Sequence, residues 1–244
     1  METPAGNAPA GSTPPEIATA SRRRVLGALA WAGIALGRTA LAQPTVRAGL
    51  RCALTPDQTE GPYFVDERLN RSDVRIDPVD NRVTRGAPLT LDLGVAALDG
   101  TRCVPVAGAI VDLWQCDATG VYSGTDDPRA DTRRSRLLRG FQITNAEGRV
   151  RFTTIYPGAY PGRAVHIHFK VRTVRGDAFT SQLYFDDALT DQVHATAPYT
   201  ALPSTRSRNR QDGLYRAGGR DLQLDVRPAG DEFAAAYDIG VARG

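Results

Sequence analysis

Apolar and polar residues alternate along several short stretches of the chain, which is the pattern of β-strands with one buried face. In residues 88–98, Leu89, Leu91, Leu93 and Val95 fall on one side of such a strand. Turn-forming residues separate the stretches, as in Asn145-Ala146-Glu147-Gly148. The strands that this pattern predicts cover residues 88–98, 108–115, 141–144, 150–155, 165–171, 180–185, 222–226 and 233–239, with the last two forming a hairpin around 228–231.

Strands at short intervals, without a long amphipathic helix, predict an all-β fold, a β-sandwich of mostly antiparallel strands with long irregular loops. Two segments also fit a helix. Residues 232–237 form one if Asp231 caps it, and residues 186–189 fit a short helical turn or a loop. Residues 198–221 are rich in Arg, Ser and Gly and are expected to form a long loop.

The first 42 residues have the order of an export signal. Arg22, Arg23 and Arg24 precede an apolar stretch, residues 25–36, and Ala40-Leu41-Ala42 offers a small-residue cleavage site before Gln43. Because twin arginines mark a signal for folded proteins, we expect export to the periplasm or the extracellular space. The alternative is an uncleaved membrane anchor, although the apolar stretch is short for a bilayer span, and we expect no stable membrane insertion. Residues 43–87 then form an irregular N-terminal arm and residues 88–244 the sandwich domain.

Charge argues against a polyanionic partner. The chain has a net charge of +3, of which +2 lies in the first 42 residues, so the remainder is nearly neutral and we expect no nucleic-acid binding. Three cysteines stand at 52, 103 and 116. Outside the cytoplasm one disulfide is the simplest arrangement. Cys103 and Cys116 flank a predicted strand and should lie too far apart to pair, so we expect a Cys52–Cys103 disulfide and a buried thiol at Cys116.

Two of the three histidines in the chain are His166 and His168, one residue apart in a predicted strand. Their side chains should project to the same face, where two imidazoles favour a shared metal ion, although a structural histidine pair is the alternative. No Cys-x-x-Cys spacing supports a structural zinc site, and a ferrous site would need a carboxylate from elsewhere. The remaining donors are Tyr160, in the turn before this strand, and Tyr122. Two phenolates and two imidazoles suit iron(III).

Several stretches resemble the intradiol ring-cleavage dioxygenases, a family that includes protocatechuate 3,4-dioxygenase and catechol 1,2-dioxygenase. The resemblance runs from residue 52 to about 190 and is densest around both tyrosines and both histidines. The stretches are Thr59-Glu60-Gly61-Pro62-Tyr63, Val111-Asp112-Leu113-Trp114-Gln115, residues 117–124, residues 153–163, His166-Ile167-His168 and Ser181-Gln182-Leu183-Tyr184-Phe185.

The resemblance implies that Tyr122, Tyr160, His166 and His168 bind a non-haem iron(III) ion, Fe(3+), with Tyr160 and His166 axial. A catechol-type substrate would bind this metal as a dianion, with Tyr160 accepting one of its protons. The ring would then open with O₂ between the two hydroxyl-bearing carbons, giving a muconate-type diacid without an organic cofactor.

Two further residues receive roles from the resemblance. Arg163 is expected to stabilise charge on the reacting ring, or, alternatively, to form an ion pair in a turn. Gln182 is expected to donate a hydrogen bond near the substrate, or to be a glutamine at a sheet edge. By contrast, we expect Trp114 in the core and His194 on the surface.

Some features leave alternatives open. The chain has no helical N-terminal zipper of the kind that catechol 1,2-dioxygenases use to dimerise, so the oligomeric state stays open. Ala159 occupies a position where related sequences often have a larger residue. A run of arginines would either attract a carboxylated catechol or form a solvated loop; its members are Arg129, Arg133, Arg134, Arg136 and Arg139. The competing functions are a non-enzymatic, transthyretin-like β-sandwich binding module and a zinc or ferrous metalloprotein using the same pocket.

Overall fold

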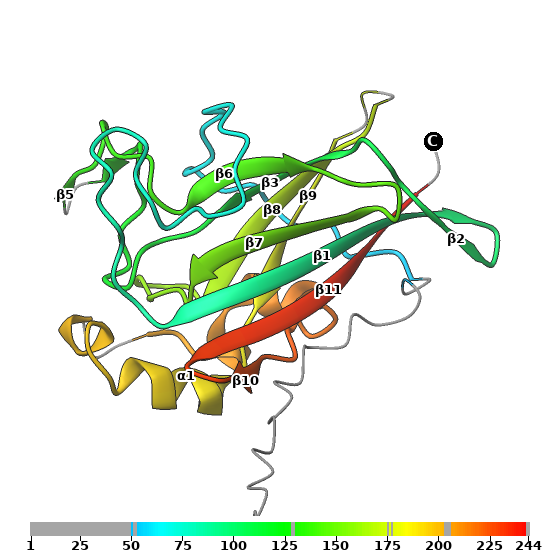
Figure 1. The fold of residues 1–244 in the computed structure, drawn as a ribbon. Coiled ribbons are helices and arrows are strands. Elements are labelled where there is room, and N and C mark those ends of the chain that lie inside the picture. The colour runs from blue at the N-terminus through cyan, green and yellow to red at the C-terminus, as the bar shows by residue number, and fades with distance from the viewer. Residues whose placement is uncertain are drawn as a thin grey trace, which may run out of the picture. The chain divides into compact units, whose positions relative to one another are not determined.

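Two β-sheets stack face to face and enclose the main hydrophobic core (Figure 1). The computed structural model describes residues 50, 53–127, 130–174, 176, 178–202 and 206–242. The predicted export segment, residues 1–42, lies outside these residues. Strands dominate, and helices are few and short, so the predicted all-β sandwich is confirmed.

The first sheet is built on β1 (Pro88–Asp99). One edge of β1 pairs in parallel with β11 (Glu232–Ala242), the last strand of the chain, so the two ends of the domain lie side by side (Figure 1). The other edge pairs antiparallel with β7 (Arg149–Ile155) and then with β2 (Arg102–Pro105). A short strand, β10 (Arg227–Ala229), extends the sheet beyond β11.

The second sheet is antiparallel throughout and has the order β6-β3-β8-β9. Its strands are β3 (Ile110–Trp114), β6 (Arg139–Ile143), β8 (His166–Arg172) and β9 (Ala178–Tyr184). Two very short strands, β4 (Asp126–Asp127) and β5 (Ala130–Asp131), pair outside it.

The period-two alternation of β8 decides which face of the second sheet carries polar side chains. Ile167, Phe169 and Val171 belong to the main core, where they face the buried leucines of β1 across the sandwich. His166 and His168 therefore lie on the outer face of the same sheet. Both are nevertheless buried, because other segments cover that face.

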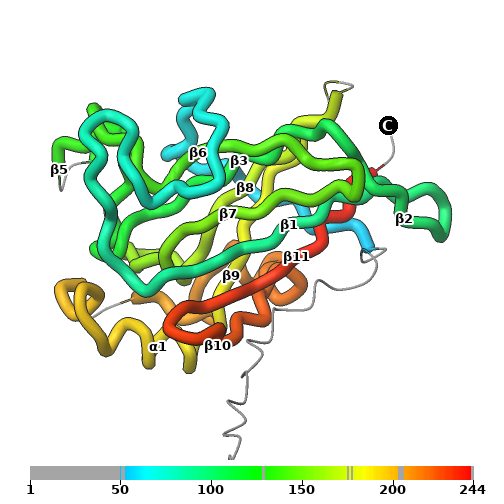
Figure 2. Tube along the Cα trace, viewed as in Figure 1, coloured from blue at the N-terminus to red at the C-terminus, as the bar shows by residue number. Residues whose placement is uncertain are grey.

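The arm that precedes β1 provides part of this cover. It passes beside β6 and β7, where Asn70 bridges to Phe141 and Asp73 to Thr153 (Figure 2). Lys170, the single lysine of the chain, forms an ion pair with Glu60 and lies 4.1 Å from the ring centre of Phe64. The arm is thus tied to the outer face of β8 by charge as well as by packing.

The predicted strands at 222–226 and 233–239 need correction. No strand forms at 222–226, which makes only the bridge from Gln223 to Tyr184, and β10 begins at Arg227. The hairpin turn at Gly230 is present, with a positive φ of 67° that glycine adopts readily. The helical alternative for residues 232–237 is wrong, because this segment is β11, which pairs with β1 over ten residues. The turn at 145–148 is confirmed, with the Gly148 N–H donating to the Asn145 carbonyl oxygen at 2.9 Å.

The short helix expected after Phe185 is α1 (Asp187–His194), and the Asp186 carboxylate accepts from the N–H groups of Ala188 and Leu189 at its start. The described residues of the segment that follows form short turns of helix, which are η1 (Tyr199–Ala201), η2 (Asn209–Gln211) and η3 (Tyr215–Gly219). Among the described helices, none is long and apolar enough to cross a bilayer.

Two other expectations concern single residues. Cys103 is disulfide-bonded and Cys116 is a buried thiol that donates to the Gly158 carbonyl oxygen at 3.6 Å. The pairing with Cys52 stays a prediction, because residue 52 lies outside the described part of the chain. His194, which was expected on the surface, is only partly exposed. His194 donates from Nε2 to the Pro157 carbonyl oxygen at 2.9 Å and stacks on Tyr199, which keeps it partly buried.

We expect Leu91→Ala to lower the free energy of unfolding by about 3 kcal/mol, because it opens a cavity between the two sheets. Leu54 is the matched control, since its side chain is 59% exposed and Leu54→Ala should cost less than about 0.5 kcal/mol. Urea unfolding of both variants measures the difference. Equal losses would contradict the assignment of Leu91 to the core.

His194 should make stability depend on pH. Burial lowers its pKa, although the Pro157 carbonyl opposes the shift. Below the ordinary histidine pKa the unfolded chain therefore binds a proton that the folded chain does not, and stability falls as the pH falls. His194→Gln keeps a donor for Pro157 and removes the titration. Between pH 7 and 5, its free energy of unfolding should fall less steeply than that of the parent, by at most about 1.4 kcal/mol per pH unit. Parallel profiles would contradict this.

Candidate metal centre

The outer face of the second sheet aligns polar and aromatic residues from three neighbouring strands. His168 on β8 stands opposite Trp114 on β3 and opposite Gln182 on β9, and His166 stands opposite Tyr184. Residues in register share a face, so all five side chains project together. All five are buried under the arm and the loops at this end of the sheet.

Tyr122 and Tyr160 reach this face from two loops that touch each other. Tyr122 follows β3, and Tyr160 follows β7. The Gly158 N–H donates to the Asp117 carbonyl oxygen at 3.1 Å, and a side chain at 158 would overlap that carbonyl. Asp117 also accepts from the Val121 N–H, which shapes the turn before Tyr122. A glycine at 158 therefore brings the two tyrosine loops together.

Four donor atoms converge where these elements meet. His166 Nε2 lies 3.0 Å from His168 Nε2, 3.1 Å from Tyr160 Oη and 3.5 Å from Tyr122 Oη. Two donors bound to one metal at about 2.1 Å, the usual metal–imidazole distance, and at right angles are about 3.0 Å apart. The three distances from His166 Nε2 thus match those of adjacent ligands around one ion. An axial pair would lie on opposite sides of the ion, about 4.2 Å apart, so the 3.1 Å between His166 Nε2 and Tyr160 Oη does not match the expected axial placement of these two residues.

Hydrogen bonding leaves the His166 lone pair aimed at this point. His166 donates from Nδ1 to the Ala164 carbonyl oxygen at 2.6 Å, so its Nε2 carries no proton in the neutral ring. His168 has no such bond, since its Nδ1 finds no partner among the described residues. Its ring is held by stacking on Trp114 instead, with centroids 4.9 Å apart and planes 9° apart.

Burial opposes charge on all four donors. It lowers the pKa of His166 to about 3 and, together with His166 itself, lowers the pKa of His168 well below its ordinary value. It also raises the pKa of Tyr160 to about 12 and that of Tyr122 well above its ordinary value. Without a cation the cluster is therefore two neutral imidazoles and two phenols. A bound metal ion would favour the ionised form of the two phenols, as cations do for bound water and thiols.

The donor set discriminates among metals. Within the described ranges no group of three or more His, Cys, Asp or Glu side chains is placed to hold a metal ion. A zinc site or a ferrous site with two histidines and one carboxylate would need such a group. The residues present, two imidazoles and two phenols that a highly charged ion can deprotonate, fit iron(III).

Arg163 and Gln182, the other two predicted site residues, lie beside the donors. Arg163 Nη1 is 3.5 Å from both Tyr160 Oη and His166 Nε2. Its Nη2 donates to Gln182 Oε1, and Gln182 Nε2 in turn donates to the Thr59 carbonyl oxygen at 2.9 Å. The structure thus brings all six predicted site residues together.

Several residues of the site were missed in the sequence. Trp114 was expected in the main core, but it packs with Cys116 and Tyr122 in a separate cluster on the outer face. Tyr63, from the arm, stacks on Tyr122 with ring centroids 4.3 Å apart. The position of Trp114 at the end of a strand, just before the Tyr122 loop, could have indicated that it lies at the site. For Tyr63 the usable signal was its segment, residues 59–63, which resembles the intradiol dioxygenases although it has no regular period.

The arginine run is not one solvated loop. Arg133 is exposed and pairs with Asp131, but Arg139 is only 2% exposed. Arg139 donates from Nε to Ser123 Oγ at 3.1 Å, from Nη2 to the Ser123 carbonyl oxygen, and from Nη1 and Nη2 to the Tyr63 carbonyl oxygen. It therefore ties the Tyr122 loop to the arm. Arg129 lies outside the described residues.

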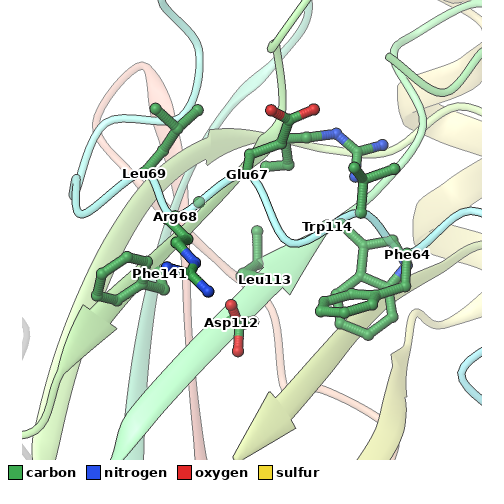
Figure 3. Close-up of a pocket in the computed structure, with 11 residues that line it drawn as sticks. Phe64, Glu67, Arg68, Leu69, Asp112, Leu113, Trp114 and Phe141 are labelled. Carbon is green, nitrogen blue, oxygen red and sulfur yellow. The ribbon is translucent and has the colours of Figure 1, made fainter. Parts of the chain in front are cut away.

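A small pocket lies beside Trp114 (Figure 3). Phe64 leans over the Trp114 indole there, with ring centroids 4.8 Å apart, and Asp112 and Phe141 line the opposite wall. Its volume of about 10 Å³ is at the lower limit for one water molecule. It is too small for an aromatic substrate.

Comparisons with known proteins agree with this geometry. A family model described as Dioxygenase matches residues 59–212. The protocatechuate 3,4-dioxygenase beta chain of Burkholderia cepacia is 37% identical over 168 residues, 62% of this chain and 69% of that protein. Catechol 1,2-dioxygenase 1 of Acinetobacter lwoffii is 29% identical over 197 residues, 70% of this chain and 60% of that protein. The chain thus spans between three fifths and seven tenths of these two relatives.

A solved structure shares the fold at higher coverage. It is the intradiol ring-cleavage dioxygenase from Tetranychus urticae, with a TM-score of 0.67 and 31% identity. The match covers 78% of this chain and 95% of that one. The residues that the family model matches include both tyrosines and both histidines.

We expect Arg139→Met to lower the free energy of unfolding by about 3 kcal/mol, because it leaves the buried carbonyl oxygens of Ser123 and Tyr63 without a charged donor. Arg133→Met is the matched control and should change stability by less than about 0.5 kcal/mol, because that arginine is exposed. Denaturant unfolding measures both. An unchanged stability in Arg139→Met would contradict the role assigned to this arginine.

Proposed function

Because this chain belongs to the intradiol ring-cleavage dioxygenases, we propose that it cleaves catechols with O₂ by means of a non-haem iron(III) ion held by Tyr122, Tyr160, His166 and His168. The carbon–carbon bond between the two hydroxyl-bearing carbons breaks. Each of these carbons gains one oxygen atom, so catechol and O₂ together give one muconate-type diacid. The atoms and electrons balance without a reductant or an organic cofactor.

The observation that carries the proposal is the convergence of two phenol oxygens and two imidazole nitrogens on one point. Bound there, iron(III) supplies a Lewis acid that favours the ionised catechol and fixes the orientation of its ring. Such a donor set has no evident use in a non-enzymatic β-sandwich, because four polar side chains, three of them buried, contribute little to stability when they face each other without a cation.

Tyr160 is the donor best placed to take a proton from the substrate. It comes from a loop and is partly exposed, whereas Tyr122 is fully buried and stacked on Tyr63. Its Oη is also 3.5 Å from Arg163 Nη1, whose charge favours the phenolate. In the phenolate form that the iron would hold, Tyr160 Oη would therefore be the acceptor of a catechol proton.

Arg163 acts on the substrate, and Gln182 holds Arg163 in place. The Arg163 guanidinium stays charged and offers its Nη1 toward the donors, where it stabilises negative charge that develops on the ring. Gln182 holds the guanidinium through its Oε1. The predicted export segment would place this reaction outside the cytoplasm.

We expect the iron-loaded protein to be red to burgundy from tyrosinate-to-iron charge transfer, and chelation of the iron to bleach it. Tyr122→Phe and His168→Ala should lose most of the colour and at least about 100-fold in oxygen uptake with catechol, because each removes a ligand. Visible spectra, iron content and an oxygen electrode provide the measurements.

Two variants serve as controls. Tyr199→Phe and His194→Gln replace a tyrosine and a histidine that bond to Tyr156 and Pro157 rather than to the donor cluster, and both should keep the colour. A colourless protein at full iron occupancy would contradict the proposal, and full activity in His168→Ala would contradict the ligand set. Oxygen uptake with catechol, protocatechuate and hydroxyquinol then identifies the preferred ring.

A further inference from the structure

Asp212 is a buried carboxylate that lies directly behind Arg163. Its side chain is 1% exposed, and both of its oxygens are used. Oδ2 accepts from Arg163 Nε at 2.9 Å and from the Ala164 N–H at 2.8 Å. Oδ1 accepts from the N–H groups of Leu214 and Tyr215 at 2.7 and 3.4 Å. One carboxylate thus joins the segment after η2 to the turn that enters β8.

These contacts leave the Arg163 guanidinium with one orientation. Asp212 holds its Nε, while Gln182 Oε1 and Tyr184 Oη, the latter at 3.3 Å, accept from Nη2. Because the guanidinium is planar, fixing two of its nitrogens fixes the third. That third nitrogen, Nη1, is the one that faces Tyr160 Oη and His166 Nε2.

The chemistry of the contact requires a carboxylate. All four groups that reach the Asp212 oxygens are donors, so an amide would turn its own N–H group toward one of them. The negative charge also compensates an arginine that is only 18% exposed. A second consequence follows from Oδ2, which holds Ala164 as well as Arg163 and so fixes the turn two residues before His166.

We propose that Asp212 is a positioning residue of the ring-cleavage reaction, which acts by holding Arg163 Nη1 against the metal-binding donors. This inference rests on the proposed function. Asp212 does not touch the reacting atoms. Without it, the guanidinium of Arg163 keeps its charge but loses its fixed direction.

The test is a double-mutant cycle on the iron-loaded protein, with Arg163→Met, Asp212→Ser and the double variant. Serine can still accept from the Leu214 N–H in a local turn, but it cannot reach Arg163 Nε, so it separates the turn from the ion pair. Asp212→Asn is a second variant of nearly unchanged shape. Asp225→Asn is the control, because Asp225 pairs with Arg227 at the surface. For each variant kcat, KM, iron content and the visible band are measured.

We expect Asp212→Ser and Asp212→Asn to lower kcat by at least about tenfold, because misplaced catalytic groups cost rates of this order. KM should change by less than about threefold, and iron content and the visible band should be retained. In the Arg163→Met background, Asp212→Ser should lower kcat by less than about twofold, because its effect passes through Arg163. Asp225→Asn should match the parent.

The outcomes separate a failure of the inference about Asp212 from a failure of the proposed function. Equal losses of kcat in both backgrounds would overturn the inference and leave the proposed function intact. So would an unchanged kcat in Asp212→Ser when Arg163→Met is slow. If Arg163→Met keeps full turnover, the roles of both residues are overturned. Loss of iron and colour in Arg163→Met would also overturn the inference, because Arg163 would then support the metal-binding donors rather than act on the substrate.

A measurement on the unaltered chain does not depend on how the variants fold. In the full-length protein prepared without metal, nuclear magnetic resonance gives the exchange rate of each arginine Nε–H. The Arg163 Nε–H should exchange at least about tenfold more slowly than that of Arg227, whose partner Asp225 is exposed. Equal rates would overturn the inference.

Discussion

The alternation of β8 is the constraint on which the rest of the site depends. Ile167 and Phe169 belong to the core between the sheets, so His166 and His168 must lie on the opposite face. A shift of register by one residue would place both imidazoles in the hydrophobic core. Core packing therefore fixes the direction of the two histidines before any metal is present, and β3 and β9 supply Trp114, Gln182 and Tyr184 in register.

A face that carries buried polar groups has to be covered, and the cover comes from segments without regular secondary structure. The arm contributes Tyr63 and Thr59, and the loops after β3 and β7 contribute Tyr122 and Tyr160. Buried charged groups hold this cover in place. Arg139 joins the Tyr122 loop to the arm, and Lys170 pairs with Glu60. Because burial opposes charge on every donor, the metal ion proposed for this site would need a high charge to ionise the two phenols.

Arg163 connects these covering segments. It donates to Asp212 in the segment after η2 and to Gln182 on β9, and it faces Tyr160 in its own loop. Parts of the chain nearly fifty residues apart thus determine the direction of one guanidinium. Function on such a scaffold depends on its loops. The rigid sheets fix where each loop begins and ends, and the loops supply the functional side chains.

The sequence by itself predicted most strands of the two main sheets and the pairing of His166 with His168, because alternation and the His-x-His spacing are local properties of the chain. Tyr122 and Tyr160 became candidates as the remaining donors and through the resemblance. It predicted a strand at 222–226 and allowed a helix at 232–237, where local preference is weak and the parallel pairing of β11 with β1 decides. Only the tertiary structure placed Trp114 against His168, Arg139 beneath the Tyr122 loop and Asp212 behind Arg163. These contacts join residues with no periodic relation, and a buried ion pair or a stacked ring is specified by where distant segments meet in space rather than by the residues that flank it.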